Sequence, residues 1–271
     1  MWSALDHIYC LLATFTNCSM LNSIMDDRYI FIHGKHAVIE ALTFRPDVIA
    51  EVFLRDDTQT QVHQKLLVHI KKVSVFSGNA VPKEVDKHAV HQGMIAKIDR
   101  EKLVVSFEDF KRTLAVTADT ALALLGEVQD PHNVGAVIRS AAAFGVSAVL
   151  IPKHRQAGVT GTVVKVSAGM AFKIPLVEVA NVNRAIEDLK KEGFFVYGLD
   201  AKGDVTVSQE TFTKPSVFVL GNEGEGIRTK TKEHCDIILS IKLHKRCESL
   251  NASASAAVVF YQWSTQHTGA L

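Results

Sequence analysis

Residues 217–227 read VFVLGNEGEGI, an apolar run with two β-branched valines followed by three glycines and two glutamates. The run predicts a buried strand, and the glycines predict a tight turn where that strand ends. A glycine-rich turn after a strand often cradles a phosphate, but Glu223 and Glu225 would repel an anion. The glycines also follow the order G-x-x-G-x-G, not the dinucleotide-binding order G-x-G-x-x-G. We therefore expect a neutral or cationic ligand at this turn.

Strands and helices alternate on both sides of the turn. From residue 121 onward, strands are predicted at 121–128, 147–152, 174–179, 194–200, 216–221 and 236–241, and helices at 133–144, 161–170, 182–193 and 253–263. This alternation predicts an α/β domain with a mostly parallel sheet that helices cover on both faces. Ligands bind such sheets at the carboxyl ends of the strands, so the turn after residue 220 lies at the expected ligand edge.

A smaller α/β unit precedes this series. Strands are predicted at 49–55, 73–78 and 91–98, and helices at 60–72 and 80–89. A helix from Lys35 places Ala37, Val38, Ala41 and Leu42 on one apolar stripe. We divide the chain into a leader (1–27), a small domain (28–98), a linker with a helix in 107–116 (99–120) and a large domain (121–271).

The composition is that of a globular protein. Of the 271 residues, 47% are hydrophobic and 22% are charged, which allows one large domain or two smaller ones. The formal net charge of +1 gives no nucleic-acid signal over the whole molecule, so an RNA site must be a local patch. Residues 228–246 hold six lysines and arginines, with only Glu233 and Asp236 as carboxylates. That segment fits either such a patch or a solvated basic face.

Metal, redox and membrane sites are not indicated. The four cysteines form no C-x-x-C pair and the twelve histidines are scattered, so we expect reduced thiols in a cytoplasmic protein without a metal site. The apolar segment near residue 10 is shorter than the roughly 20 residues that span a bilayer. A signal peptide begins with basic residues, but no Lys or Arg precedes Arg28. We interpret residues 1–27 as a disordered or non-native leader, with Met25 as an alternative start.

Two further stretches carry polar residues at helix starts. In DPHNVGAVIRSAAAFG, residues 130–145, Asn133 is predicted to cap a helix on which Arg139 lies among glycine and alanine, and Gly145 ends that helix. In ESLNASASAAVVF, residues 248–260, Ser249 and Asn251 precede a helix whose first turns are nearly all small. Taken singly, these segments also fit a surface arginine on an ordinary helix and a capped terminal helix.

Together, the motifs D-P-x-N-x-G-x-x-x-R-x-A-x-x-F-G, L-G-x-E-x-x-G-I and S-L-N-x-S resemble, in order, the three motifs of the SpoU/TrmH family of SPOUT RNA 2′-O-methyltransferases. IHGKHAVIEAL and HQGMIAKI in the small domain resemble the subgroup that methylates a guanosine ribose in 23S ribosomal RNA. The resemblance implies a C-terminal trefoil-knotted domain, a rare exception to unknotted topology. It also implies an N-terminal L30e/L7Ae-like RNA-binding domain and a homodimer packed through the knot.

The resemblance assigns residues to roles. Asn133, Arg139, Glu223, Ser249 and Asn251 correspond to the family's functional residues, and the positions that contact the cofactor S-adenosylmethionine correspond to Gly221, Ile241 and Leu250. The sulfonium of this cofactor is a cation, so nearby carboxylates are compatible with it. In our hypothesis Arg139 orients the ribose-phosphate and stabilises the developing alkoxide, because neutralising an arginine at pH 7 costs roughly 7 kcal/mol. The identity of the proton acceptor stays open.

One departure from the family pattern bears on the cofactor loop. Relatives read I-P-x-x-G before the third motif, whereas this chain has Lys242 for the proline and Lys245 for the glycine. Either the loop backbone and cofactor affinity change, or the lysines strengthen binding to RNA phosphates. Three alternatives to 23S ribosomal RNA methylation remain: a transfer-RNA ribose 2′-O-methyltransferase, a non-catalytic RNA-binding assembly factor and, less favoured, a Rossmann-type methyltransferase.

Overall fold

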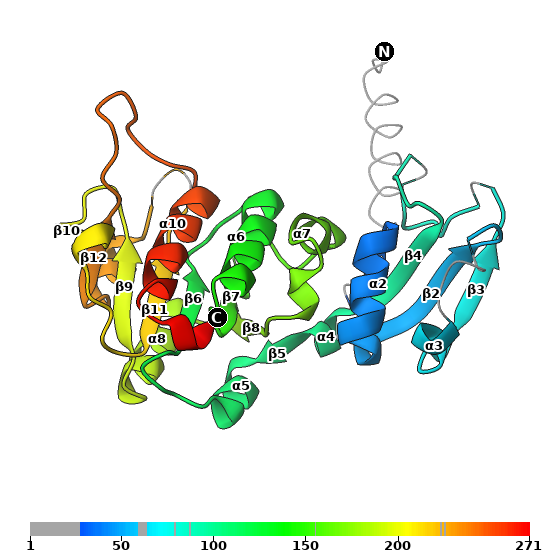
Figure 1. Ribbon diagram of the computed structural model, residues 1–271, viewed down its shortest axis with the longest axis horizontal. Coiled ribbons are helices and arrows are strands. Elements are labelled where there is room, and N and C mark those ends of the chain that lie inside the picture. Colours follow the sequence, from blue (N-terminus) through cyan, green and yellow to red (C-terminus); the bar gives the residue numbers. More distant parts are fainter. Residues whose placement is uncertain are drawn as a thin grey trace, which may run out of the picture.

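The computed structural model describes residues 28–58, 64–78, 80–86, 88–154, 156–222, 224 and 226–271. Two sheets organise these residues, a four-stranded sheet in the small domain and an eight-stranded sheet in the large one (Figure 1). The leader predicted at 1–27 and Glu223, which the resemblance assigns to the functional residues, lie outside the described residues.

The small sheet is mixed and has the order β1-β4-β2-β3. Its strands are β1 (Tyr29–His33), β2 (Ile49–Arg55), β3 (Val73–Phe76) and β4 (Met94–Asp99). Helix α2 (Lys35–Phe44) buries the predicted stripe of Ala37, Val38, Ala41 and Leu42, which confirms that prediction. A short 3-10 turn, η1 (Pro46–Val48), leads from α2 to β2.

Of the helices predicted in the small domain, one is much shorter than predicted in its described part and one is not formed. Within 60–72, the described part contains only α3 (Gln64–Leu67). Residues 80–86 and 88–89 form turns, so the helix predicted at 80–89 is wrong. Pro82 disfavours helical backbone in the residue before it, and so short a helix is marginal on its own. Val85 instead packs with Phe76 and Ile95 from the adjacent strands.

The large sheet is parallel throughout, in the order β10-β12-β9-β11-β6-β7-β8-β5. Its strands are β5 (Val104–Ser106), β6 (Ala121–Leu125), β7 (Ala148–Pro152), β8 (Leu176–Val179), β9 (Phe195–Leu199), β10 (Val205–Thr206), β11 (Ser216–Leu220) and β12 (Ile237–Ser240). Every residue of β6, β7 and β11 is buried. The predicted parallel sheet is thereby confirmed, and residues 217–220 (VFVL) lie in its central strand β11.

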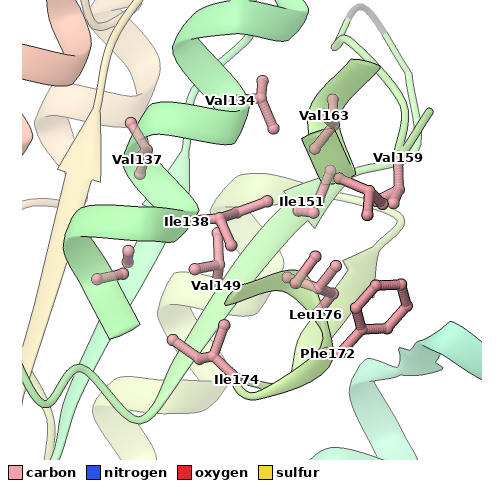
Figure 2. Packing of buried hydrophobic residues seen from close by; sticks show 14 of the residues in the cluster. Val134, Val137, Ile138, Val149, Ile151, Val159, Val163, Phe172, Ile174 and Leu176 are labelled. Carbon is pink, nitrogen blue, oxygen red and sulfur yellow. The ribbon is translucent and has the colours of Figure 1, made fainter. Parts of the chain in front are cut away.

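Helices cover both faces of this sheet. On one face lie α6 (Pro131–Ala143), α7 (Gly161–Val166), η3 (Met170–Phe172) and α10 (Ala252–Ser264). Figure 2 shows how Val134, Ile138 and Val163 of these helices meet the sheet residues Val149 and Leu176. The other face packs against α5 (Phe107–Thr113) and α8 (Val182–Lys191). Helix α9 (Thr229–Glu233) and the short turns η4 (Val207–Gln209) and η5 (Thr268–Ala270) complete the domain.

The segment 99–120 joins the two sheets and also contributes to the larger one. It contains α4 (Arg100–Leu103), β5 and α5, and β5 pairs with β8 at the end of the sheet. Helix α5 confirms the helix expected within 107–116. The Ser106 hydroxyl caps it by accepting a hydrogen bond from the backbone N–H of Asp109.

The two domains touch through α7 and α2. A Cβ added at Gly161 would lie 2.2 Å from the carbonyl oxygen of Phe31, so helix α7 approaches strand β1 backbone to backbone. Beside this contact, Lys173 Nζ lies 2.7 Å from Glu40 Oε2 in an ion pair between the domains. The small domain therefore lies beside α7, next to the end of the large sheet that β8 and β5 form (Figure 1).

Candidate functional site

The turns after β6 and β11 are tied together. The N–H of Gly126 donates to the carbonyl of Leu220 at 2.6 Å, and Asn222 Nδ2 donates to the carbonyl of Glu127 at 2.9 Å. Arg228 pairs with the Glu127 carboxylate at 2.7 Å. Because β6 and β11 are adjacent parallel strands, the turn that leads into the first motif meets the second motif at one edge of the sheet.

The turn after β11 depends on its glycines. The backbones of Asn222 and Gly226 exchange two hydrogen bonds of 3.0 Å. A Cβ at Gly221 would lie 2.3 Å from the carbonyl carbon of Gly226, a distance that side chains do not tolerate. Gly226 itself has a φ of 69°, in the left-handed region. The tight turn expected from the sequence is confirmed.

Asn133 has a role other than the predicted cap. The residue that caps α6 is Asp130, whose side chain accepts from the N–H of His132, because Pro131 has no N–H and suits the first helical position. The prediction of Asn133 as the cap is therefore wrong. Asn133 is instead buried, at 6% exposure, inside the first turns of the helix.

The first and third motifs meet through two asparagines. Asn251 Nδ2 donates to Asn133 Oδ1 at 2.9 Å, although the two residues are 118 positions apart. Asn251 also caps α10, since its Oδ1 accepts from the N–H of Ser253 at 2.8 Å. Of the polar residues predicted at the start of this helix, Asn251 thus both caps it and reaches α6.

Arg139 stands apart from these contacts. It lies on α6 away from the buried stripe, as predicted, and is exposed. Within the described part of the chain it has no hydrogen bond or ion pair, so its guanidinium is available to an anionic ligand. The structure brings Asn133 and Asn251 together but shows no contact between either of them and Arg139.

A cavity of about 380 Å³ opens at the carboxyl ends of β9, β11 and β12. Gly221, Ile241 and Leu250, the three positions expected to contact a cofactor, all line it, and so does Ser249. Much of the remaining wall is leucine, namely Leu199, Leu220, Leu239 and Leu243. The cavity is therefore an apolar slot with polar groups at its rim, which is the usual build of a small-molecule site.

Three charged residues that the motifs did not indicate, Asp200, Lys202 and Lys232, also line the cavity. Lys232 Nζ lies 2.6 Å from Asp200 Oδ2. Burial acts to raise the pKa of Asp200, but the hydrogen bonds from Lys232 and from the N–H of Lys202 outweigh it and lower that pKa below its ordinary value. The available signal was the position of Asp200, the last residue of a predicted strand and therefore at the ligand edge.

The loop before α10 carries the departure from the family pattern. This loop, orange in Figure 1, extends away from the sheet. Lys242 and Lys245 are exposed, whereas Ile241 and Leu243 line the cavity. Of the described residues other than glycine, only Gln92, Glu127 and Ala168 have positive φ. Lys245 therefore sits in a backbone conformation that any residue adopts, and the loss of the glycine strains nothing here.

The described residues also bear on two other kinds of site, a membrane span and a metal centre. None of the helices in that part of the chain is long and apolar enough to cross a membrane. Nor do these residues contain a group of three or more histidines, cysteines, aspartates or glutamates able to hold a metal ion.

Comparison with protein families gives two matches. The model of the SpoU rRNA Methylase family matches residues 121–261. A second model, described as RNA 2′-O ribose methyltransferase substrate binding, matches residues 31–104. The two matched regions correspond to the large and small sheets.

Individual proteins match over most of the chain. The protein named 23S rRNA (guanosine-2′-O-)-methyltransferase RlmB from Haemophilus influenzae is 35% identical over 242 residues, covering 88% of this chain and 98% of that protein. The protein of the same name from Neisseria meningitidis is 34% identical and covers 87% and 94%. The solved structure of the SpoU methyltransferase AviRb from Streptomyces viridochromogenes, in complex with the cofactor AdoMet, has a TM-score of 0.74 at 22% identity and covers 90% and 92%. This likeness confirms the predicted α/β fold with an N-terminal domain.

Proposed function

This chain belongs to the SpoU rRNA methylase family, and we propose that it transfers a methyl group from S-adenosylmethionine to the 2′-oxygen of a guanosine ribose in 23S ribosomal RNA. One observation carries the proposal: the first and third motifs join through Asn133 and Asn251 beside a cavity lined by the expected cofactor positions. Relatives with 34–35% identity over nearly the whole chain, named for this reaction, support it.

The cavity fits the cofactor. Its volume of about 380 Å³ lies within the range of roughly 300–1,000 Å³ typical of small-molecule sites. The leucines suit a purine ring, and the tight turn at Gly221 brings backbone groups to the cavity in place of side chains. Gly221, Ile241 and Leu250 would hold the cofactor at this edge of the sheet.

When bound, S-adenosylmethionine supplies a methyl group activated by its sulfonium. The chain has to place the ribose hydroxyl in line with that methyl group and accept the hydroxyl proton. An exposed arginine without a protein partner is suited to a phosphate, which its planar fork binds with two hydrogen bonds. Arg139 would thus hold the ribose-phosphate and stabilise the developing alkoxide, and the hydrogen bond from Asn251 to the buried Asn133 would fix the helices that frame the transfer site.

The remaining expected residues have narrower parts. Ser249 lines the cavity next to Leu250 and would contribute a polar group at its rim. Glu223, which belongs to the second motif, is assigned by resemblance to the same site. The macromolecular substrate of the reaction is RNA. The small domain would bind it, since the family model that matches this domain is described as substrate-binding. A trefoil knot around the cavity and a cytoplasmic location complete the proposal.

We also propose that two copies pair through α6 and α10. Val258 and Tyr261 on α10 are exposed at 41% and 57%, and the Tyr261 ring packs edge-on against Phe144 at a centroid distance of 5.6 Å. Apolar side chains gathered beside a functional site mark an interface. Tyr261→Asp should turn a dimer into a monomer in sedimentation equilibrium, and a wild-type monomer would exclude this assembly.

The function is tested with purified protein, methyl-labelled S-adenosylmethionine and either 23S ribosomal RNA or transfer RNA. We expect label on a guanosine ribose of 23S RNA. Arg139→Lys keeps the charge but loses the fork, so its kcat should fall roughly 100-fold, as for other lost transition-state contacts. Near-normal turnover by Arg139→Lys would show that the guanidinium of Arg139 is not needed to hold the ribose-phosphate or to stabilise the alkoxide. Label on transfer RNA alone would assign the other substrate, and the absence of cofactor binding would indicate an RNA-binding factor.

A further inference from the structure

A pair of opposite charges forms one end of the cavity. The Asp200 side chain is only 12% exposed, and its ion-pair partner Lys232 is 35% exposed. Gly226 of the tight turn comes close to the same carboxylate, because a Cβ there would lie 3.1 Å from Asp200 Oδ2. Asp200 is therefore an ordered, nearly buried acceptor inside the cavity and not a solvated surface charge.

The position of Asp200 along the sheet edge shows which part of a ligand it would meet. Asp200 follows β9, whereas Asn133 lies in the helix that follows β6, and β11 lies between these strands. Two strand spacings amount to roughly 10 Å. In the proposed function the transferred methyl group lies on the side of the Asn133–Asn251 pair. The rest of the cofactor then extends toward β9 and β12, where the leucines are.

The Asp200 carboxylate has unused acceptor capacity. A carboxylate offers about four lone-pair sites. Within the described residues, the N–H of Lys202 donates to Oδ1 at 3.0 Å and Lys232 Nζ lies 2.6 Å from Oδ2. These partners also hold the pKa of Asp200 below its ordinary value, so the group stays an ionised acceptor at neutral pH. A pair of neighbouring hydroxyls is the donor set that such a carboxylate accepts.

We infer that Asp200 accepts hydrogen bonds from the ribose hydroxyls of the bound cofactor, and that Lys232 orients the carboxylate for this contact. Asp200 is then the residue that makes the cavity select a ribonucleoside. The inference rests on the proposed function, since it assumes that S-adenosylmethionine is the ligand, and it concerns the end of the cavity remote from methyl transfer.

Isothermal titration calorimetry with three ligands tests the inference. S-adenosylhomocysteine carries both the ribose and the amino-acid part, its 2′,3′-dideoxy analogue lacks the hydroxyls, and 5′-methylthioadenosine lacks the amino-acid part. Asp200→Asn should weaken binding of the first and third ligands about tenfold each, the size of one lost charge-assisted hydrogen bond. It should leave the dideoxy analogue unchanged. Asp204→Asn, which removes an exposed carboxylate of the same loop outside the cavity, should change none of the three.

Several results would overturn the inference. Equal losses for all three ligands would mean that Asp200 only maintains the shape of the cavity, and a loss confined to S-adenosylhomocysteine would place the carboxylate at the amino-acid end. If Asp200→Asn binds the ligands too weakly to measure, Lys232→Met is measured in its place. This variant breaks the same ion pair but keeps the carboxylate of Asp200. The wild-type protein should bind S-adenosylhomocysteine more tightly than the dideoxy analogue, and Lys232→Met should reduce that difference because it removes the group that orients the carboxylate. Equal binding of the two ligands by the wild type would refute the role of Asp200, and a difference that Lys232→Met leaves unchanged would refute the role of Lys232. A wild-type protein that does not bind S-adenosylhomocysteine would refute the proposed function itself.

Discussion

The two sheets bury their strands in different ways. In the large sheet β6, β7 and β11 are buried at every residue, whereas in the small sheet β1 has one buried residue out of five. A sheet covered on both faces has only its strand ends free, so its ligand chemistry concentrates in the turns there. A sheet with a partly open face can offer a surface to a large partner. In the proposed function the large domain binds the small ligand and the small domain the RNA, and the open edge strand β1 is compatible with this assignment.

Gly221→Ala should have the largest effect on binding of the small ligand by the large domain. The added methyl group would overlap the Gly226 backbone, so the turn has to open. Overpacking of this kind costs about 1–3 kcal/mol, and we expect affinity for S-adenosylhomocysteine to fall by up to about 100-fold. Calorimetry measures the affinity, and circular dichroism checks that the domain remains folded.

Gly224→Ala is the matched control in the same turn. Its added methyl group would come no closer than 3.5 Å to the Asn222 side chain, an ordinary contact, and it should bind the ligand like wild type. Equal affinity in the two variants would show that the turn is not part of the ligand site, and the contrast between the domains would fail.

Gly161→Ala tests the junction between the two regions. The new methyl group would collide with the carbonyl oxygen of Phe31 and push β1 away from α7, at a cost of about 1–3 kcal/mol. We expect a several-fold higher KM for RNA in methylation assays, with unchanged binding of S-adenosylhomocysteine. The control is Gly158→Ala, whose nearest neighbour would be Arg100 Nη1 at 3.9 Å. If both variants keep a wild-type KM, the docking of the domains does not matter for RNA.

The smallest effect concerns acid stability in the small domain. Burial acts to raise the pKa of Asp99, but its hydrogen bond with Arg28 at 2.9 Å outweighs burial, so the net shift is downward. A lowered carboxyl pKa contributes stability above its unfolded value, and the contribution disappears as the pH falls through the folded value. Asp99→Asn should therefore reduce stability at about pH 6 more than at about pH 3. Urea unfolding at both pH values measures this, and an equal loss at both would contradict it.

Local patterns predicted much of the fold and part of the site. The alternation of apolar runs located the strands of the large sheet, and the motifs selected Gly221, Ile241 and Leu250, which line one cavity. The errors came where two local rules compete. At the start of α6, Asp130 and Asn133 are both good caps, and Pro131 decides in favour of Asp130. At 80–89 we predicted a helix, but the apolar side chain of Val85 is buried from a non-helical segment that packs against β3 and β4.

By itself, the sequence determined where most strands lie and which motif follows each, because periodicity and turn chemistry act over a few neighbouring residues. Only the tertiary structure decided that Asn251 meets Asn133 and that Asp200 lies in the same cavity as Leu250. The strand order β12-β9-β11-β6 sets these distances. That order follows from burying both faces of the sheet under helices, which depends on contacts between segments far apart in the chain.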